Sequence, residues 1–297
     1  MVRVARTAAV LQETLAHPGS REALARLLAA PRYEVLPLEG VAGEVAAHLS
    51  PEAVVTVTSS PAQGPAKTVE IAAELSRQGF RAVPHLAARQ YVSEDQLAEA
   101  LGRLDEAGVQ EVFVVGGDAE AVPGAYRDGE ELLEAVSRLA PQLRLGVPGY
   151  PEGHPQISQD DLDAALGRKT ERVGYVVAQL CLDPQAVSGW IERMRHDGIR
   201  LPVFAGVPGA VGTARLLRIA RRIGVGDSLR FLSGTGGELL RGLAAPGRFD
   251  PGPLAAGLAA SEGETAVAGL HLYTFNAVEE TEQRRRRLLQ QIQEAET

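Results

Sequence analysis

Eight short apolar runs alternate with segments of helical periodicity, and this alternation constrains the fold more than any other feature of the chain. The apolar runs span residues 33–38, 53–57, 81–85, 111–115, 144–147, 174–179, 201–205 and 269–274. Parallel strands are buried on both faces and need crossover connections, so apolar strands alternating with helices predict a parallel sheet. Eight such units within 297 residues predict a (β/α)8 TIM barrel.

The segments between the runs carry helix signals. We expect helices over 65–78, 94–107, 130–139, 158–168, 184–197, 212–223 and 277–294. Ser93 followed by Gln96 has the spacing of a capping box. Residues 7–30 predict two short helices interrupted at Pro18 and Gly19, so residues 1–30 are interpreted as an N-terminal helical extension. The long connection over 227–264 predicts a helical insertion before the last strand. No linker divides the chain, so we expect a single domain over 1–297.

A doubly wound sheet is the alternative fold. Its dinucleotide-binding marker is G-x-G-x-x-G directly after the first strand, and residues 39–44 read EGVAGE, which does not match. Residues 233–237 read SGTGG but lack the lysine of a P-loop. The barrel therefore remains the favoured fold.

Composition excludes several classes of function. A net charge of −8 provides no basic surface for nucleic acid or anionic membranes. Cys181 is the only cysteine, which excludes an intrachain disulfide and a thiolate metal cluster, and its leucine neighbours predict burial. No apolar run is long enough for a signal sequence or a membrane span, so we expect a cytoplasmic protein.

Polar side chains gather where the predicted strands end, which is where a barrel of this kind builds its active site. They are Glu34, Thr58, His85, Asp118, Tyr150, Glu152, His154, Gln179, Asp183, Tyr273, Thr274 and Asn276. Glu34 lies in an otherwise apolar strand, and a buried carboxyl group must be paired or protonated, which favours a functional role. Residues 149–155 form a loop of fixed shape, because two prolines and two glycines restrict it. The carboxylates and histidines lack the spacing of a zinc site, so no metal is predicted.

The ordered set of motifs resembles the methylenetetrahydrofolate reductase family, and the resemblance extends over nearly the whole chain. The matching segments are 33–38 (YEVLPL, family F-E-F-F-P-P), 57–60 (VTSS, V-T-Y-G), 84–88 (PHLAA, P-H-L-T-C), 116–118 (GGD, R-G-D), 150–155 (YPEGHP, Y-P-E-x-H-P), 179–183 (QLCLD, Q-x-x-x-D), 206–208 (GVP, within P-G-I-x-P) and 271–276 (HLYTFN, H-F-Y-T-L-N). The loop over 150–155 is the most specific match.

The resemblance implies that the chain reduces 5,10-methylenetetrahydrofolate to 5-methyltetrahydrofolate with hydride from NADH or NADPH. It implies two catalytic residues: Glu34 as the acid, and Asp118, which would contact the pterin and tune the electron-carrying centre. It also implies that Gln179 and Tyr273 bind the folate. It further implies a flavin (FAD) site, whose residues would be Thr58, His85, Gly117, Tyr150, His154 and either Arg168 or Lys169. The expected partners are thus small molecules, a folate and a nicotinamide nucleotide.

Two departures from the family pattern affect the flavin side. Gly116 stands where the family has the arginine of R-G-D, and Ser59 stands where it has an aromatic residue. Two hydride routes therefore stay open, a relay through FAD and a direct transfer from the nicotinamide to the folate. A tetrahydrofolate-dependent methyltransferase or a folate-binding protein on the same barrel is the alternative function. Glu34 favours the reductase, because a protein that only binds folate needs no acid in this strand.

Overall fold

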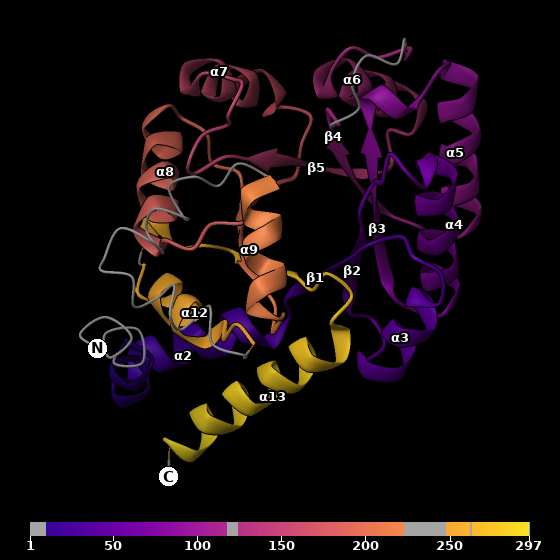
Figure 1. The fold of residues 1–297 in the computed structure, drawn as a ribbon. Coiled ribbons are helices and arrows are strands. Elements are labelled where there is room, and N and C mark those ends of the chain that lie inside the picture. Colours follow the sequence, from indigo (N-terminus) through magenta and orange to yellow (C-terminus); the bar gives the residue numbers. More distant parts are fainter. Residues whose placement is uncertain (1–9, 118–123, 223–247, 262, 297) are drawn as a thin grey trace.

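Eight parallel strands close into a barrel in sequence order (Figure 1). The computed structural model describes residues 10–117, 124–222, 248–261 and 263–296. The strands are β1 Arg32–Val35, β2 Val54–Val57, β3 Arg81–Ala87, β4 Glu111–Val115, β5 Arg144–Gly149, β6 Tyr175–Ala178, β7 Val203–Pro208 and β8 Gly269–Tyr273. The last strand pairs with the first, with Arg32 opposite His271 and Glu34 opposite Tyr273. The prediction of a (β/α)8 barrel is confirmed.

Helices follow the strands and surround the barrel. They are α3 Val41–His48, α4 Gly64–Arg77, α5 Glu94–Glu106, α6 Gly129–Leu139, α7 Gln159–Lys169, α8 Pro184–His196, α9 Thr213–Arg222 and α13 Val278–Glu294, with short 3-10 turns η1 Ala88–Gln90 and η2 Gly263–Thr265. Side-chain caps fix several starts: Ser93 accepts from the backbone N–H of Gln96, and Asp183 from that of Gln185. Asp183 thus begins α8.

Two further helical parts lie outside the repeating pattern. Residues 10–16 are helical, and α2 Pro18–Ala29 begins after a break at His17, as the sequence predicts. In the insertion before β8, α12 Gly252–Ala259 is helical and packs against α2, whereas residues 227–247 lie outside the described ranges. No helix in the described part of the chain is long and apolar enough to cross a membrane.

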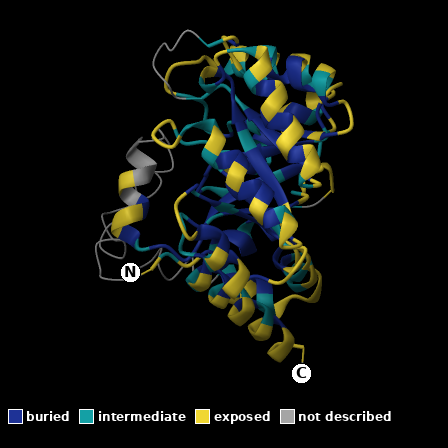
Figure 2. Ribbon diagram, turned by 90° about the vertical axis from the view of Figure 1, so that its right-hand side faces the viewer, coloured by how far each residue is buried: buried dark blue, intermediate teal, exposed yellow. Residues whose placement is uncertain are grey.

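The strands are buried on both faces, which accounts for their continuous apolar character. Their outward side chains pack against the helices, whose outer faces are exposed (Figure 2). Inside the barrel, Val83, Phe113, Tyr175 and Val177 form a separate small core. Cys181 is buried, as expected.

A charged cluster closes the end of the barrel where the strands begin. Arg32 Nη2 donates to Glu111 Oε1 and, over 3.0 Å, to the hydroxyl oxygen of Tyr175. Arg144 reaches the other oxygen of Glu111 at 3.3 Å. Gly146 leaves room for this packing, because a Cβ there would lie 2.1 Å from the Tyr175 ring. An ion pair between β1 and β4 therefore crosses the barrel beneath its small core.

Several strand ends differ from the sequence prediction: β3 and β5 each continue two residues further than predicted, and the largest differences are in β1 and β7. β1 stops at Val35 instead of residue 38, because the Leu36 backbone bonds a side chain: its N–H donates to Asn276 Oδ1 over 2.7 Å and its carbonyl accepts from Nδ2. β7 begins at Val203, two residues later than predicted, and continues to Pro208. These shifts move no candidate site residue to the opposite face of its strand.

Candidate active site

Glu34 lies on the inward face of β1, near the end of the barrel where the strands stop. Its Oε2 is 3.0 Å from Nε2 of His271 on β8 and 3.8 Å from Nε2 of His85 on β3. The side chains of Glu34, His85 and His271 are only 13%, 10% and 1% exposed. Only the contact with His271 is short enough for a hydrogen bond. The carboxyl group is therefore paired with a neighbour that lies 237 residues away in the sequence.

Burial separates the pKa values of this cluster in opposite directions. It raises the pKa of Glu34 to about 7, and the nearby His85 opposes this only in part. Burial lowers the pKa of His85 to about 4 and that of His271 to about 3, where the positive charge of Arg32 adds to the effect. Desolvation disfavours whichever form is charged, so it raises the pKa of the carboxyl group and lowers the pKa values of the histidines. Near neutral pH these pKa values leave the histidines uncharged and Glu34 divided between its protonated and ionised forms.

Tyr273 and Gln179 lie beside this cluster on the barrel's inner surface. The Tyr273 hydroxyl donates to Gln179 Oε1 over 3.3 Å, and its ring packs edge-on against His271 at 4.9 Å between centroids. Gly206 makes space for the ring, because a Cβ there would lie 2.7 Å from Tyr273 Cε2 and 2.3 Å from the Ala178 carbonyl oxygen. The two residues expected at the folate are thus brought together next to Glu34.

Two candidate residues carry buried polar atoms that have no hydrogen-bond partner among the described residues. They are Thr58 Oγ1 and His85 Nε2. Both backbone polar groups of Thr58 are hydrogen-bonded: its N–H donates to the Val35 carbonyl, and its own carbonyl accepts from the Thr68 hydroxyl. Buried polar atoms are usually paired, so these two are suited to contact a ligand in the barrel mouth.

The loop over 149–155 follows β5 and keeps its two aromatic residues together. The rings of Tyr150 and His154 lie edge to face, 5.4 Å between centroids. Gly153 has φ +81°, a conformation that glycine adopts without strain. Gly149, the last residue of β5, leaves room for the Trp190 ring of α8, because a Cβ at Gly149 would lie 2.2 Å from that ring. Tyr150 is also close enough to Tyr273 to contribute to its raised pKa, although burial is the larger cause.

The structure distinguishes the two cations that the sequence left as alternatives. Arg168 forms a bidentate ion pair with Glu130 of α6, with N to O distances of 2.9 to 3.0 Å. The side chain of Lys169 forms no hydrogen bond or ion pair with the described residues, and burial lowers the pKa of its amino group. Lys169 is therefore the better candidate for an incoming anionic group, because Arg168 already has a carboxylate partner.

The segment after β4 is described only in part. Gly117 has φ +86°, and its Cα packs close to Ala87, where a Cβ would lie 3.1 Å from the alanine methyl group. Asp118, predicted to contact the pterin, lies outside the described residues.

The two residues that depart from the family pattern offer little to a flavin. The Ser59 hydroxyl donates to Gln90 Oε1 over 2.7 Å, and Gly116 has no side chain.

Sequence reasoning assigned no role to His271, although it belongs to the matched segment 271–276. The available signal was its spacing, because His271 and Tyr273 share the inward face of the last strand. Conversely, Asn276 was a candidate pocket residue, and the structure shows its side chain bonding the Leu36 backbone.

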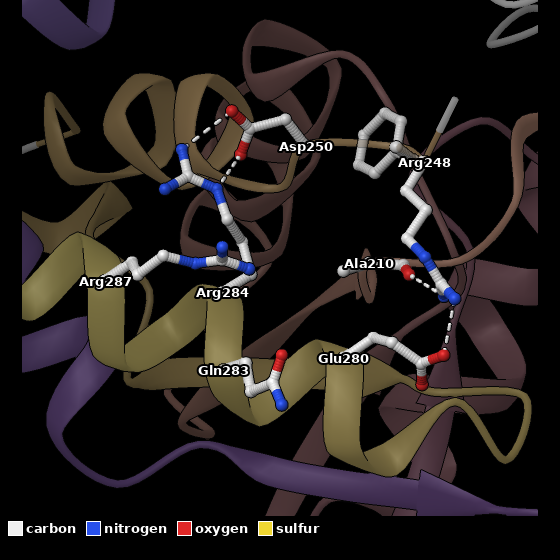
Figure 3. A pocket seen from close by; sticks show the side chains of 8 residues that line it. Ala210, Arg248, Asp250, Glu280, Gln283, Arg284 and Arg287 are labelled. Atoms are coloured by element: carbon white, nitrogen blue, oxygen red, sulfur yellow. Dashed lines mark hydrogen bonds and ion pairs between the residues drawn. The ribbon is translucent and has the colours of Figure 1, made fainter. Parts of the chain in front are cut away.

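A hollow of about 230 Å³ lies outside the barrel, beside α13 (Figure 3). Its lining includes Arg248, Asp250, Glu280 and Arg284. Arg284 pairs with Asp250 at 2.7 Å, and Arg248 pairs with Glu280 at 2.5 Å. These two arginines are thus already neutralised by carboxylates within the hollow, which is separate from the Glu34 cluster.

Comparison with known proteins agrees with the motifs. The family model for methylenetetrahydrofolate reductase matches residues 44–226. The chain belongs to the methylenetetrahydrofolate reductase family. Methylenetetrahydrofolate reductase 1 of Schizosaccharomyces pombe is 26% identical over 146 residues, covering 45% of this chain and 24% of the yeast protein. Methylenetetrahydrofolate reductase 2 of Saccharomyces cerevisiae is 23% identical over 135 residues, which cover 41% of this chain and 22% of that yeast protein.

The aligned parts are thus about a quarter of the length of these curated relatives. Among solved structures, the sialic acid aldolase of Ruminococcus gnavus has a TM-score of 0.39 and 15% sequence identity, covering 60% of this chain and 62% of that one.

Proposed function

We propose that this protein reduces 5,10-methylenetetrahydrofolate to 5-methyltetrahydrofolate with hydride from NADH or NADPH, using Glu34 as the acid. The observation that carries the proposal is a buried carboxyl group with a pKa of about 7 at the barrel mouth of a chain from this family. The reaction consumes one hydride and one proton, so a group that holds a proton near neutral pH is what the chemistry requires.

Glu34 supplies the proton that opens the methylene bridge. Protonation of the bridging nitrogen breaks its bond to the methylene carbon and leaves an iminium, whose cationic carbon accepts the hydride and becomes a methyl group. After proton transfer, the carboxylate stabilises the cation beside it. The neutral histidines next to Glu34 do not compete for the proton, because burial disfavours their charged forms.

Gln179 and Tyr273 would bind the folate. They lie within hydrogen-bond distance of each other and beside His271, so a substrate that contacts them is held close to Glu34. Amide and phenol groups offer both donors and acceptors, which suits the alternating donors and acceptors of a pterin edge. Asp118 remains proposed at the pterin from the family motif alone.

The flavin side of the pocket fits FAD poorly. A guanidinium is missing at Gly116, an aromatic ring is missing at Ser59, and Arg168 is paired with Glu130. Stacking and charge-assisted contacts are therefore lost together. Thr58, His85, Tyr150, His154 and Lys169 remain as contacts, which we propose the nicotinamide nucleotide uses. We therefore propose direct hydride transfer from the nicotinamide to the folate.

The test combines a spectrum with an assay. The purified protein is expected to be colourless and to oxidise NADH or NADPH only when methylenetetrahydrofolate is added, with 5-methyltetrahydrofolate identified by mass spectrometry. A yellow protein with a flavin spectrum would overturn direct transfer. A protein that oxidises neither nucleotide in the presence of the folate would overturn the reductase and leave the methyltransferase or folate-binding alternative. The role of Glu34 is tested by Glu34→Gln, which should lower turnover. Glu39→Gln, at an exposed glutamate in the loop after the same strand, is the matched control and should leave turnover unchanged.

A further inference from the structure

The hydrogen bond between Glu34 and His271 defines where the acid's proton lies. His271 Nε2 is 3.0 Å from Glu34 Oε2, whereas His271 Nδ1 is buried with no partner among the described residues. A buried N–H without a partner is rarer than a buried acceptor without one. The imidazole therefore carries its hydrogen on Nε2 and donates it to Oε2. With Oε2 occupied as an acceptor, the proton of the carboxylic acid belongs on Oε1.

Arg32 lies directly below this pair. It precedes Glu34 by two residues on the same inward face of β1, and it is the Cα partner of His271 across the β1–β8 ladder. Its guanidinium is fixed by Glu111 and Tyr175, and Glu111 is shared with Arg144. Two guanidinium groups and one carboxylate leave a net positive charge in this cluster. A fixed positive charge beside a buried imidazole makes the imidazolium costly.

The other charged or titratable groups around Glu34 in the described structure do not replace His271. On β8, Tyr273 donates to Gln179 and the Ala178 carbonyl. On β3, His85 is 3.8 Å away, too far for a hydrogen bond. The inward residues of β2, Val54 and Thr56, do not titrate. His271 is therefore the one side chain in the described part of the chain that hydrogen-bonds the Glu34 carboxyl group.

We propose that His271 is a positioning residue for the acid: as a neutral imidazole it donates its Nε2 hydrogen to Glu34 Oε2, so that Oε1 carries the transferable proton toward the substrate. This rests on the proposed function of Glu34. His271 neither gains nor loses a proton in the reaction. Its hydrogen bond persists in both states of the carboxyl group and is stronger to the carboxylate, because a charged acceptor strengthens the bond.

Replacement of His271 by leucine and by glutamine separates this role from simple packing. Turnover of the wild type is expected to fall as the pH rises through about 7, because Glu34 must be protonated. His271→Leu removes the donor to the carboxylate, so this alkaline limb should move by about one pH unit to higher pH, and kcat should fall about tenfold or more with KM little changed. His271→Gln keeps an N–H of similar reach and should leave the limb in place, with kcat within about threefold of wild type.

A second measurement does not depend on activity. With 13C-labelled glutamate, the Glu34 carboxyl signal, assigned by its loss in Glu34→Gln, can be titrated by NMR. It should titrate at higher pH in His271→Leu than in wild type, and at the wild-type pH in His271→Gln. His196→Gln, at an exposed histidine on α8, is the control. Should the wild type lack reductase activity, the proposed function fails while this titration still tests the role of His271.

Three outcomes would overturn the proposal. One is a wild-type carboxyl titration in His271→Leu. Another is an equal loss of kcat in His271→Leu and His271→Gln, which would show that the shape of the imidazole matters rather than its N–H donor. If His271→Leu does not fold, His271→Gln decides alone, and a displaced Glu34 titration in that variant would contradict the donor role.

Discussion

At the scale of single residues, one effect sets the chemistry of the site: burial makes charge costly. It favours the protonated form of Glu34 and the neutral forms of His85 and His271. The consequences for stability have opposite signs. The folded-state pKa of Glu34 is raised, so its contribution is present below about 4.5 and is lost as the pH rises through about 7. The histidine pKa values are lowered, so stability is lost as the pH falls from about 6.5 toward 4 and 3.

Glu34→Gln tests the role of Glu34 as a proton donor and the effect of its buried negative charge on stability. Turnover should fall about 100-fold or more, because the amide cannot donate an acidic proton. The free energy of unfolding should equal that of wild type near pH 4.5 and exceed it at pH 8.5 by up to about 3 kcal/mol, because glutamine avoids burying a carboxylate. Urea unfolding at the two pH values measures this difference. Near-wild-type turnover would remove Glu34 from the mechanism. If the free energies of unfolding of the variant and the wild type differ by the same amount at both pH values, the burial effect is contradicted.

At the scale of elements, the meeting of β8 and β1 builds the site. The Glu34–His271 bond joins these two strands, and the segment after β8 holds the end of β1 in place. Thr274 Oγ1 donates to the Glu34 carbonyl over 2.6 Å, and Asn276 bonds both backbone groups of Leu36. Asn276 has φ +61°, which asparagine tolerates better than most residues. The polar residues after β8 thus hold the strand that carries Glu34.

Asn276→Ala should destabilise the protein by about 2 to 3 kcal/mol, because two hydrogen bonds to Leu36 are lost and alanine disfavours positive φ. Asn276→Gly loses the same bonds without the conformational strain, so it should be less destabilising by about 1 kcal/mol. Both variants should lower kcat, because β1 is no longer held against β8. Thermal unfolding and steady-state kinetics measure the two effects. A glycine variant less stable than the alanine variant would contradict the strain.

At the scale of the whole molecule, the barrel places the charged cluster of Arg32, Glu111 and Arg144 at one end of its interior and Glu34 near the other. The Arg32–Glu111 pair joins β1 to β4 across the barrel. Both side chains are almost fully buried, at 3% and 8% exposed. Breaking such a pair leaves one buried charge uncompensated, whereas replacing both partners with apolar residues does not.

Arg32→Met alone should therefore destabilise the protein by about 3 to 5 kcal/mol, because the partly exposed Arg144 is then the one charged partner of Glu111 among the described residues. Arg32→Met combined with Glu111→Leu should recover most of this loss. Urea unfolding of the two variants measures the recovery. A double variant no more stable than the single one would show that Arg32 acts through packing on Tyr175 and Phe204, whose rings lie 4.4 and 5.0 Å from its guanidinium carbon.

Much of the architecture could be predicted locally. Strand burial on both faces, helix periodicity and capping residues such as Ser93 depend on neighbours within a few positions, and they predict the order of strands and helices that the barrel shows. The ends of β1 and β7 were predicted less accurately, because the end of a strand depends on where its hydrogen-bonding partners end. β1 ends at Val35 because Asn276, 240 residues later, takes over the bonding of Leu36.

Local patterns in the sequence were enough to predict the barrel and to recognise the family motifs. They also single out Glu34, since a carboxyl group in an apolar strand is visible without coordinates. The neighbour of that carboxyl group could be identified from the folded chain alone. His271 meets Glu34 because the last strand closes onto the first with Arg32 opposite His271. Closure sums the registers of all eight strand pairs, and no local pattern contains that sum. For the same reason, Asn276 and Glu34 look alike in sequence as polar residues at strands, and only closure places Asn276 against the Leu36 backbone and Glu34 against His271.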